Sequence, residues 1–406
     1  MRFLVCCRAL SLLVLFGKCQ CLAQNLPIPL LPRPSGNYAI GRQSFYLTDS
    51  SRTDQFSSAP SHHRELMIHI WYPARRPSGS QGSAYLPGAK KLDEDAAARS
   101  AMLQEFESRW PSIVSGSVQS HAIPGAPAMH GVFPVVLFSH GLMSITFCYT
   151  AQIEDLVSHG YVVVAIDHPN AAAAILFPDG HVRPFRHLPS APSKDPLQAM
   201  IASASAEVQI GAEDVRFVLD SLTEQKIPLT KVMDLKRVAA VGHSYGGTLA
   251  TRACQLDPRI KACISEDGAV NPVGAFIDYP DKLPFTQPFL LIEIERRSPT
   301  DEELSHMKES RAQWEAYLTH KRLQLESCKT GSYDVVLSRP GMRHASFGDE
   351  LLRSGASNPA YDADNLALIE RIDRSFLDKS LKHTTAPLLD HSSEGLSGVT
   401  VEHIGK

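Results

Sequence analysis

The sequence predicts an α/β fold, in which a mostly parallel sheet is covered by helices on both faces. The first observation behind this prediction is that short apolar runs rich in β-branched residues alternate with segments of helical spacing. Such runs are typical of buried parallel strands that are joined by helices. The second is that one run, Val238-Ala239-Ala240-Val241, leads through a glycine-rich turn straight into a helical segment.

The expected elements follow one another along the chain. Strands are expected at 45–48, 66–73, 134–139, 161–167, 238–241, 260–265, 289–294 and 333–337. Helices are expected at 96–110, 152–158, 208–222, from 248 onward and at 365–376. Prolines, alanines and glycines interrupt the alternation near 77–130 and 169–200, so we interpret these stretches as insertions. Met102, Leu103, Phe106 and Trp110 form one apolar face, which is expected to pack on the core.

The chain divides into three parts. Residues 1–23 begin with Arg2, continue through an apolar stretch at 10–16 and end in small residues at Ala23, which predicts a signal peptide. Residues 24–382 are expected to form a single domain, and the polar residues 383–406 a flexible tail. The protein is therefore expected to be secreted or periplasmic.

Composition excludes several classes of function. The 406 residues are 43% hydrophobic and carry a formal net charge of −3, which is ordinary for a globular protein. No basic block indicates nucleic-acid binding, and no phosphate-binding glycine loop or metal-ligand spacing occurs, so no cofactor or metal is expected. Oligomeric state is left open. Cleavage of the leader would leave four cysteines whose pairing the sequence does not determine: Cys148, Cys254, Cys263 and Cys328.

The glycine-rich turn carries the first candidate catalytic residue. In Gly242-His243-Ser244-Tyr245-Gly246-Gly247 a serine stands at the apex of a strand–turn–helix unit. A sharp turn of this kind presents a serine hydroxyl above the sheet, and flanking glycines let strand and helix approach closely. The alternative is a plain turn whose serine caps the helix. We take Ser244 as the candidate nucleophile.

A serine hydroxyl needs a base, an acid that orients the base, and donors for the oxyanion. His344 directly follows the last expected strand and is the candidate base, whereas the other downstream histidines lie in charged stretches or in the tail. Asp267 follows the first strand after the turn and is the favoured acid. Glu293, Glu295 and Asp301 compete for this role one strand later.

The oxyanion donors are expected on two segments. The backbone N–H groups of Leu142, after the strand 134–139, and of Tyr245, after the nucleophile, are the candidates. His140 is expected to have a structural role. His62 and His63 lack further ligands at metal spacing and are interpreted as a solvated loop.

These residues together resemble the plasma-type (group VII) platelet-activating factor acetylhydrolases and their bacterial relatives, within the α/β-hydrolase superfamily. The resemblance spans roughly 35–380. Its pieces are Gly36-Asn37-Tyr38-Ala39-Ile40-Gly41, Ile70-Trp71-Tyr72-Pro73, Phe138-Ser139-His140-Gly141-Leu142, Leu156-Val157-Ser158-His159-Gly160-Tyr161, the serine turn, Asp267-Gly268, and His344 with Phe347 and Asp349. It implies an α/β-hydrolase fold with Ser244, Asp267 and His344 as the triad and Leu142 and Tyr245 as oxyanion donors.

The expected function is that of a secreted serine esterase of the calcium-independent phospholipase A2 type. The substrate is expected to be a small ester or a phospholipid with a short acyl chain, with peripheral contact to a lipid surface. The alternatives are a general carboxylesterase, similar to dienelactone hydrolase or to polyester hydrolases, and a secreted binding protein on a hydrolase scaffold.

Overall fold

The computed structural model describes residues 31–56, 62–80, 82–169, 171–187, 196–268, 286–296, 298–306, 310–328, 330–352, 358–390 and 396–405. The predicted signal peptide lies outside these residues.

A ten-stranded sheet forms the centre of the molecule, in the order β12-β11-β10-β9-β8-β4-β5-β2-β1-β3. Strands β4, β5, β8, β9, β10 and β11 run parallel, whereas β2 joins β5 antiparallel and β12 joins β11 antiparallel. The strands are β1 Ala39–Thr53, β2 His63–Ala74, β3 Ile123–Pro124, β4 Phe133–Ser139, β5 Val162–Asp167, β8 Met233–His243, β9 Ile260–Glu266, β10 Phe289–Ile294, β11 Ser332–Leu337 and β12 Val399–Ile404. The parallel strands are apolar on both faces, as their continuous hydrophobic runs predict.

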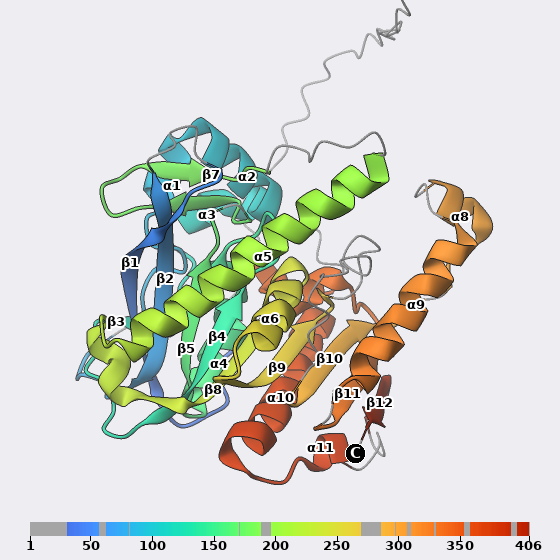
Figure 1. Ribbon diagram of the computed structural model, residues 1–406. Helices are drawn as coiled ribbons and strands as arrows, with labels where there is room; N and C mark the ends of the chain where they lie inside the picture. Colours follow the sequence, from blue (N-terminus) through green and yellow to red (C-terminus); the bar gives the residue numbers. More distant parts are fainter. Residues whose placement is uncertain are drawn as a thin grey trace, which may run out of the picture.

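Helices cover both faces of the sheet, and Figure 1 shows α5 and α6 crossing one of them. Helices α4 and α10 pack on the opposite face, where α10 contacts β8 and β9. The helices are α1 Ala89–Glu94, α2 Ala96–Phe106, α3 Trp110–Val114, α4 Thr150–Ser158, α5 Pro196–Thr223, α6 Tyr245–Leu256, α8 Asp301–His306, α9 Arg311–Glu326, α10 Pro359–Lys382 and α11 Pro387–Asp390. This is the α/β architecture that the sequence predicts.

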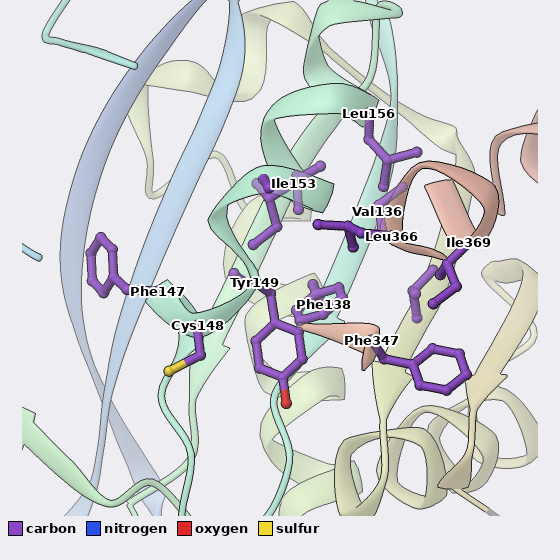
Figure 2. Packing of buried hydrophobic residues seen from close by; sticks show 14 of the residues in the cluster. Val136, Phe138, Phe147, Cys148, Tyr149, Ile153, Leu156, Phe347, Leu366 and Ile369 are labelled. Carbon is purple, nitrogen blue, oxygen red and sulfur yellow. The ribbon is translucent and has the colours of Figure 1, made fainter. Parts of the chain in front are cut away.

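Two hydrophobic cores lie on the two faces of the sheet. The larger core joins β4 to α4, α10 and the 3₁₀ turn η5 (His344–Phe347), and Figure 2 shows Phe138, Tyr149, Ile153, Phe347 and Ile369 gathered there. The second core joins the other face to α5 and α6. Because η5 belongs to the larger core, its packing fixes the position of His344.

The two expected insertions lie on the face that carries the larger core. The first holds α1, α2 and α3, and its Met102, Phe106 and Trp110 are buried as predicted, whereas Leu103 is 40% exposed. The second holds the hairpin of β6 (Ala174–Leu176) and β7 (Val182–Pro184). It ends earlier than expected, because α5 already begins at Pro196.

The expectation of a flexible tail after residue 383 is wrong for the described part of that segment. Strand β12 pairs with β11 over six residues, from Val399 opposite Leu337 to Ile404 opposite Ser332. Val399 and Ile404 are buried there. The two lie on opposite faces of the strand, because Val399 packs in the larger core and Ile404 in the second. The residues between them are exposed or partly buried, so the sequence of β12 lacks the continuous apolar run of a buried strand.

The four cysteines retained after the predicted cleavage are free thiols and are buried. Cys254 and Cys263, on either side of the α6–β9 connection, are therefore not linked. Among the described residues, no helix combines the length and the apolar character needed to cross a membrane.

Candidate active site

Ser244 stands at the turn between β8 and α6, in a backbone conformation that L-residues rarely adopt. Its φ is +55° and its ψ is −122°. The neighbouring glycines explain why the turn can form, because a Cβ at Gly246 would lie 2.1 Å from the carbonyl oxygen of Ser139 and one at Gly242 would lie 2.3 Å from that of Gly246. The strained backbone and close packing place the serine at the carboxyl edge of the sheet.

His344 lies within hydrogen-bond distance of this serine. Its Nε2 atom is 2.8 Å from Ser244 Oγ, although 100 residues separate the two in sequence. The ring also packs against His243, with ring centroids 4.6 Å apart. The structure thus brings the predicted base to the predicted nucleophile.

Asp267 lies on the other side of the imidazole. Its Oδ2 atom is 2.5 Å from His344 Nδ1, and its Oδ1 atom accepts the backbone N–H of Ile294 at 3.3 Å. Burial alone would raise the pKa of Asp267, but the hydrogen bonds from His344 and Arg296 and the guanidinium charge outweigh it, so the pKa lies below its usual value. The carboxyl group is therefore ionised and able to orient the ring.

The competing acids lie elsewhere. Glu293 forms an ion pair with Lys321, Asp301 is paired with Arg311, and Glu295 is exposed. Asp267 is thus the carboxylate that contacts His344.

Arg296 is a residue of this site that the sequence analysis missed. Its guanidinium donates to both carboxylate oxygens of Asp267, from Nη1 to Oδ1 at 3.0 Å and from Nη2 to Oδ2 at 2.8 Å. A basic residue just beyond the end of β10 was the available signal, since strand ends of a parallel sheet meet at one edge.

The loop after β4 carries Leu142 to the same place, and its polar atoms are held by buried partners. The N–H of Gly141 donates to Tyr149 Oη at 3.0 Å, and the N–H of Met143 donates to the carbonyl of Ala171 at 2.7 Å. Tyr149 Oη in turn lies 2.8 Å from His243 Nδ1.

His140 fixes the peptide unit that bears the Leu142 N–H. Burial lowers the pKa of His140 to about 4, so the ring is neutral. Its Nε2 accepts the N–H of His168 at 3.3 Å, so its proton lies on Nδ1, which donates to the Gly141 carbonyl at 2.8 Å. Since the C=O and N–H of one trans peptide point in opposite directions, this bond sets the direction of the Leu142 N–H.

A cavity of about 180 Å³ joins these groups. It is lined by Phe106 of α2, by Gly141 and Leu142 of the β4 loop, and by Ser244 and His344. Tyr245 begins α6 directly after Ser244, so its N–H belongs to the first turn of that helix, where backbone donors are not used by the helix itself. The two predicted oxyanion donors thus come from segments that meet at Ser244.

The described residues contain no group of three or more histidine, cysteine or acidic side chains arranged to hold a metal ion. His62 and His63 are both exposed.

Comparison with known proteins agrees with this geometry. A sequence model described as "Alpha/beta hydrolase family" matches residues 136–391, which include the serine turn, Asp267 and His344. The chain belongs to the alpha/beta hydrolase family. A second family model, "Platelet-activating factor acetylhydrolase, isoform II", matches residues 27–181.

The individual proteins to which this chain is similar share 26–27% sequence identity with it. A probable 1-alkyl-2-acetylglycerophosphocholine esterase of Arthroderma benhamiae is 27% identical over 61% of this chain and 62% of its own. A platelet-activating factor acetylhydrolase of Cavia porcellus is 26% identical over 65% of this chain and 60% of its own. The alignments thus span about 60% of these relatives. The solved structure of a ferulic acid esterase from Streptomyces cinnamoneus superposes with a TM-score of 0.67, at 27% identity, over 92% of this chain and 99% of that one.

Proposed function

We propose that the protein is a serine esterase that hydrolyses short-chain acyl esters, with Ser244 as nucleophile, His344 as base and Asp267 as the acid that orients it. The observation that carries this proposal is the chain of contacts from Ser244 Oγ to His344 Nε2 at 2.8 Å and from His344 Nδ1 to Asp267 Oδ2 at 2.5 Å. A serine activated by a base that is itself oriented by a third group is the arrangement that acyl transfer requires.

In the proposed mechanism, Ser244 Oγ attacks the ester carbonyl carbon while His344 Nε2 takes the hydroxyl proton. The N–H groups of Leu142 and Tyr245 donate to the oxyanion of the tetrahedral intermediate. Collapse of the intermediate breaks the ester bond, and the leaving alkoxide takes the proton from His344. A water molecule then gives its proton to His344 and attacks the acyl-enzyme, which releases the acid and restores Ser244.

The size of the cavity supports a short acyl group. A cavity of about 150 Å³ accommodates a molecule of roughly benzene size, and the space beside Ser244 is about 180 Å³. An acetyl group fits inside this volume, and because the cavity opens to solvent, a larger acyl group would have to extend through its mouth. Together with the similarity to acetylglycerophosphocholine esterases, this favours a phospholipid or small ester that carries a short acyl chain.

A carboxylesterase that acts on aromatic or polymeric esters is the second candidate, because the superposed esterase from Streptomyces covers nearly the whole chain. The leader predicted at 1–23 would place either activity outside the cytoplasm.

The test compares the mature wild-type protein with Ser244→Ala and Ser44→Ala. Ser44 is a matched control because it also contacts a histidine, with its Oγ 2.7 Å from His69 Nδ1. Ser244→Ala should lower kcat by at least about three orders of magnitude with the fold intact, and Ser44→Ala should leave it near wild type. A fluorophosphonate probe should label the wild type and Ser44→Ala, but not Ser244→Ala.

The compounds tested for hydrolysis are a short-acyl phospholipid, a p-nitrophenyl ester, a feruloyl ester and a polyester. Preference for the phospholipid with a two-carbon acyl group supports the first candidate, and preference for the feruloyl ester or polyester supports the second. Activity that survives in Ser244→Ala would refute the triad. Absence of both labelling and hydrolysis in the wild type would favour a binding protein.

A further inference from the structure

Arg296 binds the carboxylate that orients the proposed base. The guanidinium makes two parallel hydrogen bonds to Asp267, at 3.0 and 2.8 Å, and the second of these reaches Oδ2, the oxygen that also accepts from His344 Nδ1. The side chain of Asp267 is fully buried, and that of Arg296 is 29% exposed. A bidentate pair of this kind fixes the plane of the carboxylate as well as its charge.

This arrangement changes the electrostatics of the base. In a Ser-His-Asp relay the carboxylate stabilises the imidazolium that forms when the serine proton moves. A fixed cation on the same carboxylate offsets part of that negative charge and repels the imidazolium, so it favours the neutral ring. The neutral ring is the form that accepts the serine proton.

We propose that Arg296 is a positioning residue that sets the lowest pH at which the esterase is active. It fixes the orientation of the Asp267 carboxylate and keeps His344 neutral, and therefore able to act as a base, at lower pH. The inference rests on the proposed function, and it deepens that function by assigning a pH range to the same site. It concerns a residue that acts through Asp267 and does not itself contact the reacting atoms.

Other charged groups around His344 are balanced by partners of their own or lie across the cavity. Arg343, the residue before it, is paired with Glu350 at 2.5 Å. The groups on the remaining elements that face the ring or the cavity are His243, Glu105, Cys148, Tyr149 and Asp349. Beyond Asp267, Glu293 of β10 is paired with Lys321 of α9. Among the ion pairs of the described residues, the cation that touches Asp267 besides His344 is Arg296.

The experiment measures kcat/KM from pH 4.5 to 9 with a soluble aryl acetate read at a pH-independent wavelength. Arg296→Gln removes the charge, and Arg296→Lys keeps the charge but loses the bidentate geometry. Arg322→Gln is the control, because it removes an arginine paired with Glu326 and Glu402 on the exposed surface. The titration of the His344 ring is followed in parallel by NMR, with the signal assigned from its loss in His344→Gln.

Arg296→Gln should move the acid limb of the profile up by about half to one pH unit, a size that reflects partial screening by solvent. The titration midpoint of His344 should rise by the same amount. Arg296→Lys should keep the limb within about 0.3 units of wild type and lower the plateau, and Arg322→Gln should overlay the wild type.

The inference would be overturned if Arg296→Gln left both the acid limb of the kcat/KM profile and the titration midpoint of His344 at their wild-type positions. A lower Tm as the sole effect would mean that the residue has only a structural role. Failure of the proposed function is a different result, namely a wild type that neither hydrolyses esters nor reacts with a fluorophosphonate. The NMR titration still tests the effect of Arg296 on His344 in that case.

Discussion

A serine that contacts a histidine, which in turn contacts an aspartate, does not by itself mark a catalytic site in this chain. Two further relays occur among the described residues: Ser139–His168–Asp214 and Ser44–His69–Asp167. Ser139 is only 1% exposed, so no substrate reaches it. Ser44 is exposed but lies in the middle of β1, away from any turn that presents backbone donors. What distinguishes Ser244 is its φ of +55° and its place in a cavity with Leu142.

The choice between two acids can be tested directly at the residue scale. Asp267→Asn should lower kcat by roughly three to four orders of magnitude, because an amide in place of the carboxylate favours the wrong tautomer of His344 and does not stabilise its charged form. Glu295→Gln should change kcat less than twofold, since Glu295 is exposed and lies one position before Arg296. Turnover of an aryl acetate and thermal unfolding of both variants provide the measurement. A large loss confined to Glu295→Gln would move the acid to the later strand.

The loop between β4 and α4 is the element that carries Leu142, the proposed oxyanion donor. Its N–H groups at Gly141 and Met143 and its carbonyl at Gly141 all have protein partners, so the loop need not reorganise when charge develops. Tyr149 anchors the loop. Its ring lies in the larger core beside Phe138 (Figure 2), with ring centroids 5.1 Å apart. Its hydroxyl contacts the N–H of Gly141 and Nδ1 of His243.

Tyr149→Phe should therefore lower kcat by roughly 10-fold to 100-fold and change KM by less than about threefold, because the ring still packs but the loop loses its anchor. Tyr161→Phe is the matched control. It also removes a tyrosine hydroxyl bond, to Asp378 at 2.6 Å, but Tyr161 precedes β5 at the opposite edge of the sheet. Both variants should lose about 1 kcal/mol of stability. Equal kcat values in the two variants would show that the hydroxyl of Tyr149 has no part in positioning the loop.

The elements that the sequence predicts well are those whose signals are local. Each of these signals lies within a dozen residues, and hydrophobic periodicity together with flanking turn residues identifies it. They are the apolar runs of β4, β5, β8, β9, β10 and β11 and the serine turn. Family resemblance strengthened the choice of Asp267, which the sequence pattern already favoured over the later acids. The role of Tyr149 was not predictable, because its contact with His243 joins residues 94 apart in sequence and leaves no local pattern. Arg296 and Asp267 are 29 residues apart, and the one signal for their contact was a basic residue just beyond the end of β10.

At the scale of the whole molecule, buried charge on both faces of the sheet makes stability depend on pH in two opposite ways. Asp214 forms ion pairs with Arg64 and Arg52. Burial alone would raise the pKa of Asp214, but these cations and the hydrogen bond with His168 outweigh it, so the pKa lies below its usual value. Asp167 behaves alike, with its pKa lowered to about 2 by His69 despite burial. Such groups contribute stability above about pH 4, and this contribution is lost as the pH falls further.

The opposite case is a pair of buried acids between β9 and α10. The amide of Gln152, on α4, donates to Glu266 and, at 2.7 Å, to Asp373, and all three side chains are fully buried. Burial and the neighbouring acid raise the pKa of Glu266 well above its usual value, and burial raises that of Asp373. The folded state therefore holds a proton that the unfolded state gives up near pH 4.5, and the free energy of unfolding should fall as the pH rises beyond that value.

Glu266→Gln should abolish most of this dependence, because an amide fills the same space and carries no charge to bury. At pH 8 the variant should be more stable than the wild type, because the raised pKa of the wild-type carboxyl costs stability once the pH exceeds its unfolded value, and at pH 4.5 the two should be equal. Urea unfolding at half-unit steps between these limits measures the difference. Glu94→Gln, which removes an exposed acid paired with Lys91, should give a difference that does not vary with pH.

A Glu266→Gln variant that is less stable by the same amount at every pH would mean that the carboxyl serves only as a hydrogen-bond partner of Gln152. The expected result, in contrast, would place the stability optimum of the fold on the acidic side of neutrality, where Arg296 is proposed to keep the base active.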